Sequence, residues 1–182
     1  MKKILLSLFL LIAMCATPAF AYNLRDFSSD AKIISAMELL EQTGQYDVFN
    51  NMKKNAIKVK FYNLSGYGNV YATNSYDSTG RRVILINSAY ANAPAEQIAC
   101  LIAHESMHVL RKPTLEEETI ATQREAATWI KLRNNRASYP QSKLTKRLDQ
   151  LAELQMASSG GGQNYIQTKI ANSSFYRSQF GM

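Results

Sequence analysis

The chain contains 182 residues, of which 46% are hydrophobic, and it carries a formal net charge of +7 at pH 7. This length suits one domain together with a processing segment. The lysine and arginine residues are spread along the chain and accompany no nucleic-acid-binding motif. We therefore interpret the positive charge as ordinary solubility charge, and we expect no nucleic-acid partner.

The first 21 residues have the pattern of a signal peptide. Two lysines precede an apolar stretch over 4–14 that is too short to span a bilayer stably. Residues 19–21 read Ala-Phe-Ala, which matches a cleavage site, so we expect the mature chain to begin at Tyr22. A lipoprotein signal ending at Cys15 is less favoured, because the residue before it is a methionine and not a small residue. The pattern predicts export to the periplasm or beyond the cell, with no membrane span in the mature chain.

Two helices and then two strands are predicted in the first part of the mature chain. Residues 28–30 resemble a helix start, and apolar residues follow at helical spacing up to Gly44. A shorter helix is expected over 46–52. Residues 57–61 alternate apolar and basic side chains, which indicates a strand with one wet face, and a short strand is expected near 70–72.

Residues 82–87 form the clearest predicted strand, because their unbroken apolar run indicates burial on both faces. A helix should follow, with Pro94 in its first turn and its end near 111–113. This helix contains both histidines of the chain, so its position decides where their side chains point.

The two histidines, His104 and His108, stand in the pattern His-Glu-x-x-His. Residues i and i+4 share a helix face, so both imidazoles can point at one spot, and imidazole nitrogens suit zinc. Glu105 lies about a quarter turn away, where it can contact a metal-bound water more easily than the metal. The pattern predicts a zinc site with Glu105 as its catalytic carboxylate.

Cys100 would be the only cysteine of the mature chain, so we expect no internal disulfide. It lies four residues before His104 on the same helix face, where it could serve as a metal ligand. A lone cysteine in an apolar helix is more often a small core residue, and we favour that interpretation.

A catalytic zinc usually has three protein ligands, and the chain has no third histidine. Thr114 and Glu117 resemble a capping box, so a second helix should follow the motif helix as an antiparallel hairpin and run to about Leu132. Glu118 then lies closest to the level of the histidines and is the predicted third ligand. Glu125, on the same face, is an alternative ligand or a partner of a ligand. An acidic first turn that complements the helix dipole is the other explanation of these glutamates.

Further helices are predicted toward the C-terminus. A loop over 134–141 precedes a helix over 142–156, and residues 158–162 resemble a flexible joint before a last helix over about 165–180. Trp129 is interpreted as a core aromatic residue and not as part of the metal site.

The order of strand, motif helix and glutamate-bearing helix resembles the core of small bacterial gluzincin-type zinc metallopeptidases, over residues 57–129. The resemblance implies an α+β, zincin-like fold in which a small mixed or antiparallel sheet packs on the motif helix. The helical hairpin and further helices would follow the sheet. It implies one domain over 22–182, with its core at about 57–132 and its C-terminal helices over 142–180.

The resemblance also implies roles for individual residues. It assigns the zinc ligands as His104, His108 and Glu118, and it assigns Glu105 as the general base. Thr122 stands where some members of the family have an acidic residue near the site, so that acidic neighbour is missing at this position.

The expected function is that of an exported zinc-dependent metallopeptidase that acts as a monomer on a peptide or protein substrate, including cell-envelope substrates. Glu105 would take a proton from a zinc-held water molecule and return it to the leaving amine. The substrate backbone would pair with a strand at 70–72 or 83–86. Four tyrosines are candidates for stabilising the oxyanion: Tyr67, Tyr71, Tyr76 and Tyr165.

Two other functions stay open. A non-catalytic or degenerate zincin could bind envelope polymer or a partner protein, although a structural site has no need of Glu105. A closed fourth ligand such as Cys100 would favour that alternative. An exported helical adaptor with a chance motif would predict that metal has no effect on stability.

Overall fold

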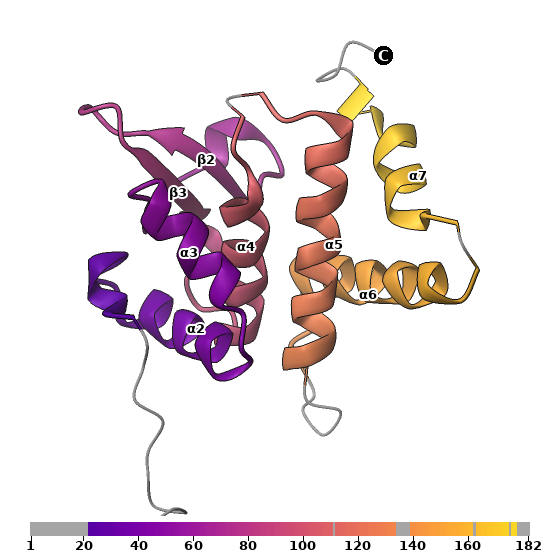
Figure 1. Ribbon diagram of the computed structural model, residues 1–182, viewed down its shortest axis with the longest axis horizontal. Coiled ribbons are helices and arrows are strands. Elements are labelled where there is room, and N and C mark those ends of the chain that lie inside the picture. Colours follow the sequence, from indigo (N-terminus) through magenta and orange to yellow (C-terminus); the bar gives the residue numbers. More distant parts are fainter. Residues whose placement is uncertain (1–21, 111, 134–138, 162, 175, 178–182) are drawn as a thin grey trace, which may run out of the picture.

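The computed structural model describes residues 22–110, 112–133, 139–161, 163–174 and 176–177, and within them the fold is α+β (Figure 1). The predicted signal peptide, including Cys15, lies outside the described residues. The helices are α2 (Ala31–Gln42), α3 (Tyr46–Lys54), α4 (Ala95–Met107), α5 (Leu115–Leu132), α6 (Lys143–Gly161) and α7 (Tyr165–Asn172). The strands are β1 (Lys58–Tyr62), β2 (Ala72–Tyr76) and β3 (Arg82–Asn87).

The three strands form a mixed sheet in the order β1-β3-β2. The pairing of β1 with β3 is parallel, and that of β2 with β3 is antiparallel. The apolar run of β3 is buried as predicted, and the strand lies at the centre of the sheet. The expectation that 83–86 could pair with a substrate is therefore wrong, because β3 already has a neighbour on each side. The strand expected near 70–72 begins at Ala72 and continues to Tyr76.

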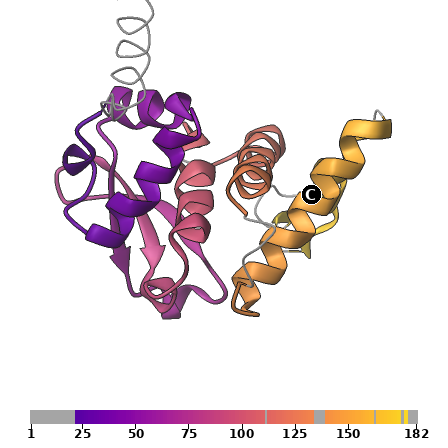
Figure 2. The same cartoon turned by 90° about the horizontal axis from the view of Figure 1, so that it is seen from below.

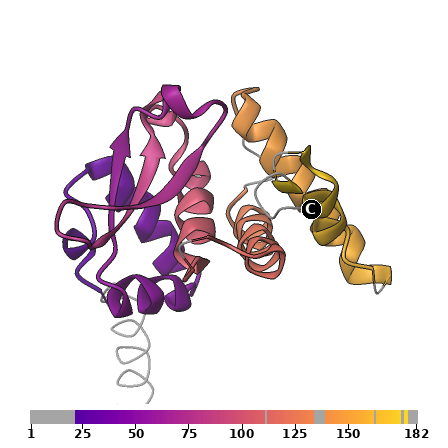
Figure 3. The same ribbon diagram turned by 90° about the horizontal axis from the view of Figure 1, so that it is seen from above.

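The helices α2, α3 and α4 pack with the sheet around the larger core. Asp30 begins α2 as predicted, since its side chain accepts hydrogen bonds from the backbone N–H groups of Lys32 and Ile33. Three of the apolar residues of α2 at helical spacing, Ile33, Met37 and Leu40, are fully buried, and Ile34 is partly buried. Figures 2 and 3 show α5 between this part of the molecule and the pair formed by α6 and α7.

The helix α4 ends at Met107, earlier than the expected end near 111–113. His108 has a ψ of 130°, so the chain continues as extended backbone from this residue. In Figure 1 the chain leaves the upper end of α4 and enters the upper end of α5, so the two helices run in opposite directions, as the hairpin prediction required.

The capping box at the start of α5 is only half formed. The Thr114 side chain accepts a hydrogen bond from Glu117 N, as predicted. The Glu117 carboxylate does not reach back to Thr114, and instead accepts hydrogen bonds from the backbone of Val109 and of Leu110, the latter at 3.0 Å. Glu117 thereby satisfies N–H groups that have no helical acceptor, because the backbone is extended after Met107.

The C-terminal helices differ from the prediction at their ends. The expected joint at 158–162 is wrong over 158–161, since α6 continues to Gly161, and Gly162 lies outside the described residues. The hydroxyl of Ser158 donates to Leu154 O at 2.8 Å, so this residue is satisfied within a helix. The last helix ends at Asn172, and the end expected near residue 180 falls outside the described residues.

Two groups of buried side chains hold the helices together. The larger core includes Trp129, whose indole N–H donates to Asp149 Oδ1 at 2.8 Å, so its interpretation as a core residue is confirmed. The smaller one joins α5, α6 and α7 through Ala126, Leu151, Ile166 and Ile170. No helix in the described part of the chain has both the length and the apolar character needed to cross a membrane.

Candidate metal centre

The two histidines meet at the C-terminal end of α4. His104 lies in the last turn, and His108 is the first residue after the helix. The Nε2 atoms of the two rings are 3.2 Å apart. His108 keeps a helical φ of −68° and leaves the helix only through ψ, so its side chain still follows the direction of the i+4 position. The two imidazole rings therefore converge as predicted, although α4 ends earlier than expected.

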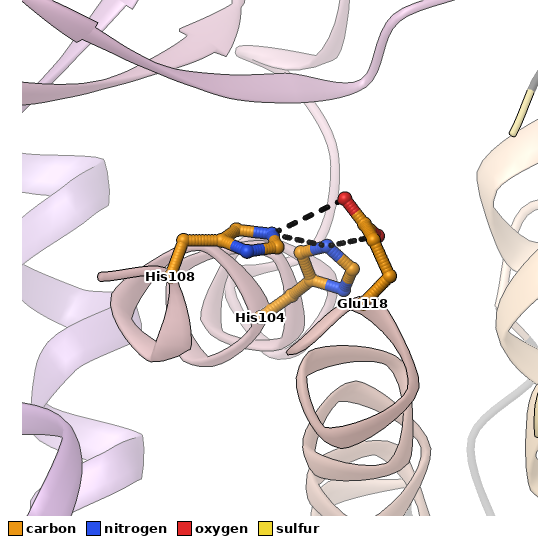
Figure 4. A group of neighbouring side chains, drawn as sticks. All are labelled: His104, His108 and Glu118. Carbon is orange, nitrogen blue, oxygen red and sulfur yellow. Dashed lines mark hydrogen bonds and ion pairs between the residues drawn. The ribbon is translucent and has the colours of Figure 1, made fainter. Parts of the chain in front are cut away.

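Glu118 joins the histidines from the first turns of α5 (Figure 4). Its Oε1 lies 3.7 Å from His108 Nε2, and its Oε2 lies 3.8 Å from His104 Nε2. The ligand atoms of the three side chains all lie within 4.8 Å of one another. The three residues are buried, with 7%, 5% and 6% of His104, His108 and Glu118 exposed.

The spacing and chemistry of this group fit a small divalent ion. Ligands about 2.0–2.1 Å from a tetrahedral zinc ion lie about 3.3–3.4 Å from one another, close to the distances between these three side chains. Two imidazoles and one carboxylate are also a ligand set of catalytic zinc sites. Glu118 Oε2 is buried and has no hydrogen-bond partner among the described residues, which is costly for a carboxylate unless a cation is bound. The group could thus hold a metal ion.

Glu125 lies behind His104 and not beside its metal-facing nitrogen. Its Oε2 is 3.1 Å from His104 Nδ1, at ion-pair distance although not aligned as a hydrogen bond. Glu125 therefore contacts His104 and is not a member of the group that could hold a metal ion. It lies three residues after Thr122 on α5, so an acidic side chain stands one turn beyond that position. Glu117 lies near Nδ1 of His108 in a similar way but at a longer distance, with its Oε1 at 3.8 Å.

Arg147 of α6 pairs with Glu125 through Nη1 and Oε1, and its guanidinium lies 5.3 Å from the centre of the Tyr71 ring. Burial raises the pKa of Glu125, but the charges of Arg147 and His104 outweigh it and lower this pKa overall. Arg147 was not predicted from the sequence, because nothing in a helical pattern relates a residue of α6 to a glutamate of α5.

The electrostatics of the two imidazoles differ. Burial, together with the charges of His104 and Arg82, lowers the pKa of His108 to about 3, so this ring is neutral at ordinary pH. Burial also acts to lower the pKa of His104, but Glu125 outweighs it and raises this pKa. Neutral imidazole is the form that binds a metal, and a carboxylate behind the ring increases its basicity.

Glu105 lies in the wall of the cavity that the three ligands face, which has a volume of about 640 Å³. It is 7% exposed, and burial raises the pKa of its carboxyl group. Asn74 of β2 donates to its Oε2 at 2.7 Å. The motif glutamate thus shares the cavity with the metal group without being part of it.

Two of the four tyrosines considered from the sequence, Tyr67 and Tyr71, line this cavity, whereas Tyr76 and Tyr165 are not among its lining residues. Tyr176, which was not predicted from the sequence, also lines the cavity and forms a side-chain hydrogen bond with Glu118. Burial, followed by the charge of Glu118, raises the pKa of Tyr176. The hydroxyl therefore stays protonated and can donate to the carboxylate.

Cys100 takes the position of a core residue. It is fully buried in the larger core, and burial raises the pKa of its thiol. It is not a member of the metal-binding group, so its possible role as a ligand is wrong and its interpretation as a small core residue is confirmed.

Comparisons with protein-family models, with curated proteins and with solved structures find no match to this chain. A buried group that could hold a metal ion faces a cavity large enough for part of a peptide, and a further carboxylate lies in its wall. This arrangement can bind a cation and present it to a ligand in the cavity.

Proposed function

We propose that the chain is an exported zinc-dependent metallopeptidase with a zincin-like fold, as its resemblance to gluzincin-type enzymes implied. The observation that carries the proposal is the meeting of three groups in one cavity wall. The ligand atoms of His104, His108 and Glu118 lie within 4.8 Å of one another, and Glu105 lines the same cavity as a second, separate carboxylate. A purely structural metal site has no use for such a group.

Zinc is the proposed ion because two imidazoles and one carboxylate match its preferred ligands and leave a fourth position for water or substrate. When bound, zinc would lower the pKa of a water molecule toward ~7 and polarise a carbonyl group. Glu105 would accept a proton at its carboxylate and pass it to the leaving amine. Glu125 would orient the His104 ring through Nδ1, so that Nε2 faces the ion.

A peptide or protein substrate suits the edge of the sheet. β2 is an outer strand in the order β1-β3-β2, and its residues Ala72, Thr73 and Asn74 line the cavity. An extended peptide could add to this edge through main-chain hydrogen bonds and pass over the end of α4. Tyr67, Tyr71 and Tyr176 are the tyrosines supported for contact with a substrate carbonyl, because all three line the cavity.

The test is the zinc content and the hydrolysis of a mixed peptide library, measured on the purified protein and on three variants. We expect about one zinc per chain in the parent, and loss of zinc in His108→Ala and in Glu118→Ala. Glu105→Gln should keep zinc and lose hydrolysis. Zinc binding without hydrolysis in the parent would favour the non-catalytic alternative, and substantial hydrolysis by Glu105→Gln would reject the proposed general base.

A further inference from the structure

The side-chain amide of Asn74 joins the edge strand to the end of the motif helix. Its Nδ2 donates to Glu105 Oε2 at 2.7 Å and to Glu105 O at 2.8 Å. Its Oδ1 accepts a hydrogen bond from Arg82 Nη2 at 3.1 Å. Both polar atoms of this amide therefore form hydrogen bonds. Two of the three bonds go to Glu105, which lies 31 positions away along the chain.

We propose that Asn74 is a positioning residue for Glu105, and that Arg82 fixes the orientation of the Asn74 side-chain amide. This inference depends on the proposed peptidase function for its catalytic meaning, because it assigns Glu105 the role of general base. The contact itself does not depend on that function, and the two can be tested separately.

Arg82 determines which way the amide of Asn74 points. Arg82 lies on the central strand β3, opposite Tyr76 and two residues before Ile84, the partner of Asn74. Alternate residues of a strand share a face, so Arg82 and Asn74 lie diagonally across the strand pair on one face of the sheet. A guanidinium group only donates, so it must face Oδ1, and the NH₂ group must then face Glu105.

Arg82 is also attached to the metal side of the site. It is 9% exposed, and its Nη2 donates to the backbone carbonyl of His108, the residue that ends α4. One buried cation thus contacts both the amide that holds Glu105 and the backbone of a proposed ligand. This shared partner fixes the distance between the general base and the ligand more firmly than either contact alone.

The hydrogen bond from Asn74 has a direct consequence for the chemistry of Glu105. It engages Oε2, so Oε1 becomes the oxygen that would take a proton in the reaction. The donor belongs to the strand whose outer edge is proposed to bind the peptide. Substrate binding along β2 and the alignment of Glu105 would therefore depend on the same residue, and small displacements of a catalytic group are costly to rate.

The sharpest variant is Asn74→Asp, which keeps the shape of the side chain and replaces the NH₂ donor with an acceptor. The new oxygen would face Glu105 Oε2, so attraction becomes repulsion, while Arg82 keeps its acceptor. We expect kcat to fall at least about tenfold with KM changed less than about threefold, and with zinc content unchanged. Asn92→Asp is the matched control, since it makes the same chemical change at an exposed position outside the cavity.

A second measurement detects the contact without any turnover. Asn74→Asp should lower Tm, and adding Glu105→Gln to the same chain should restore most of the loss, because the glutamine amide can donate to the new aspartate. Tm shifts that simply add, or a kcat that Asn74→Asp leaves unchanged, would overturn the inference. If the Tm shifts were coupled but the protein hydrolysed no peptide, the contact between Asn74 and Glu105 would be supported. The peptidase function, and with it the positioning role of Asn74 in catalysis, would be overturned.

Discussion

The two sides of the candidate site differ in how far apart their residues lie along the sequence. On the α4 side, His104, Glu105 and His108 fall within five consecutive residues, and one helical turn brings them together. On the other side, Glu125 is held by Arg147 of another helix, and Glu118 by Tyr176 from beyond α7. One helical turn thus arranges the groups of α4, whereas the two glutamates of α5 depend on partners from other elements for their charge and orientation.

The difference predicts unequal effects of substitution. Under the proposed function, a ligand or the general base contacts the ion or the substrate directly, so its loss should remove function and leave the fold. A residue such as Arg147 acts through another side chain and also joins two helices, so its loss should affect stability as well as metal affinity.

Glu118→Gln should weaken zinc binding by more than about 100-fold, because it removes the charged ligand and leaves two neutral imidazoles. The fold should be retained, since the amide has the same size as the carboxylate. Competition with a zinc-binding dye would measure the affinity. The matched control is Glu116→Gln, an exposed residue of the same helical turn, and an equal loss of affinity there would contradict the assignment of Glu118.

Arg147→Met should lower the free energy of unfolding by about 3 kcal/mol, because it leaves the buried Glu125 carboxylate without its cation. Chemical denaturation would measure the loss, and adding Glu125→Gln should recover part of it. Arg133→Met is the control, since Arg133 pairs with Asp149 at 3.8 Å in a more exposed position, where an ion pair contributes less than about 1 kcal/mol. Equal losses in the two variants would show that Glu125 does not need its partner.

The same difference decides what could be predicted from the sequence. The motif residues were found because helical periodicity alone relates positions four apart, and Glu118 followed from the antiparallel order of two adjacent helices. Asn74 and Arg147 could not be found in this way. Asn74 contacts a residue 31 positions away, and its place depends on the register between β2 and β3, which no local pattern specifies.

The fold follows the same rule. The burial of β3 was predicted from its apolar run, whereas its central place between a parallel and an antiparallel neighbour was not. The end of α4 at Met107 was also missed. It depends on Arg82 and Glu117, which bind the backbone just after the helix from other elements. Local propensity could therefore predict that a helix carries the motif, but not the residue at which it ends.

Tyr176→Phe should weaken zinc binding by about fivefold, since a hydrogen bond to a carboxylate contributes about 1 kcal/mol. The loss would be smaller than that in Glu118→Gln, because the ligand itself remains. Tyr165→Phe is the control, as Tyr165 is not among the lining residues of the cavity. If the two variants bound zinc equally well, Tyr176 would have no part in orienting Glu118.

The smallest effect is expected for Asp77→Asn, a local contact away from the metal group. The hydrogen bond from the Thr79 hydroxyl, followed by those from the backbone of Arg81 and Thr79, lowers the pKa of Asp77. A lowered pKa means that the carboxylate stabilises the fold above its unfolded pKa of about 4, and that this contribution is lost as pH falls below that value. The parent should have a slightly higher Tm than the variant at pH 7, and the difference should shrink toward pH 2. A Tm difference that stays constant with pH would mean that ionised Asp77 does not stabilise the segment from Asp77 to Arg81, whose hydrogen-bond donors all lie within four residues of Asp77.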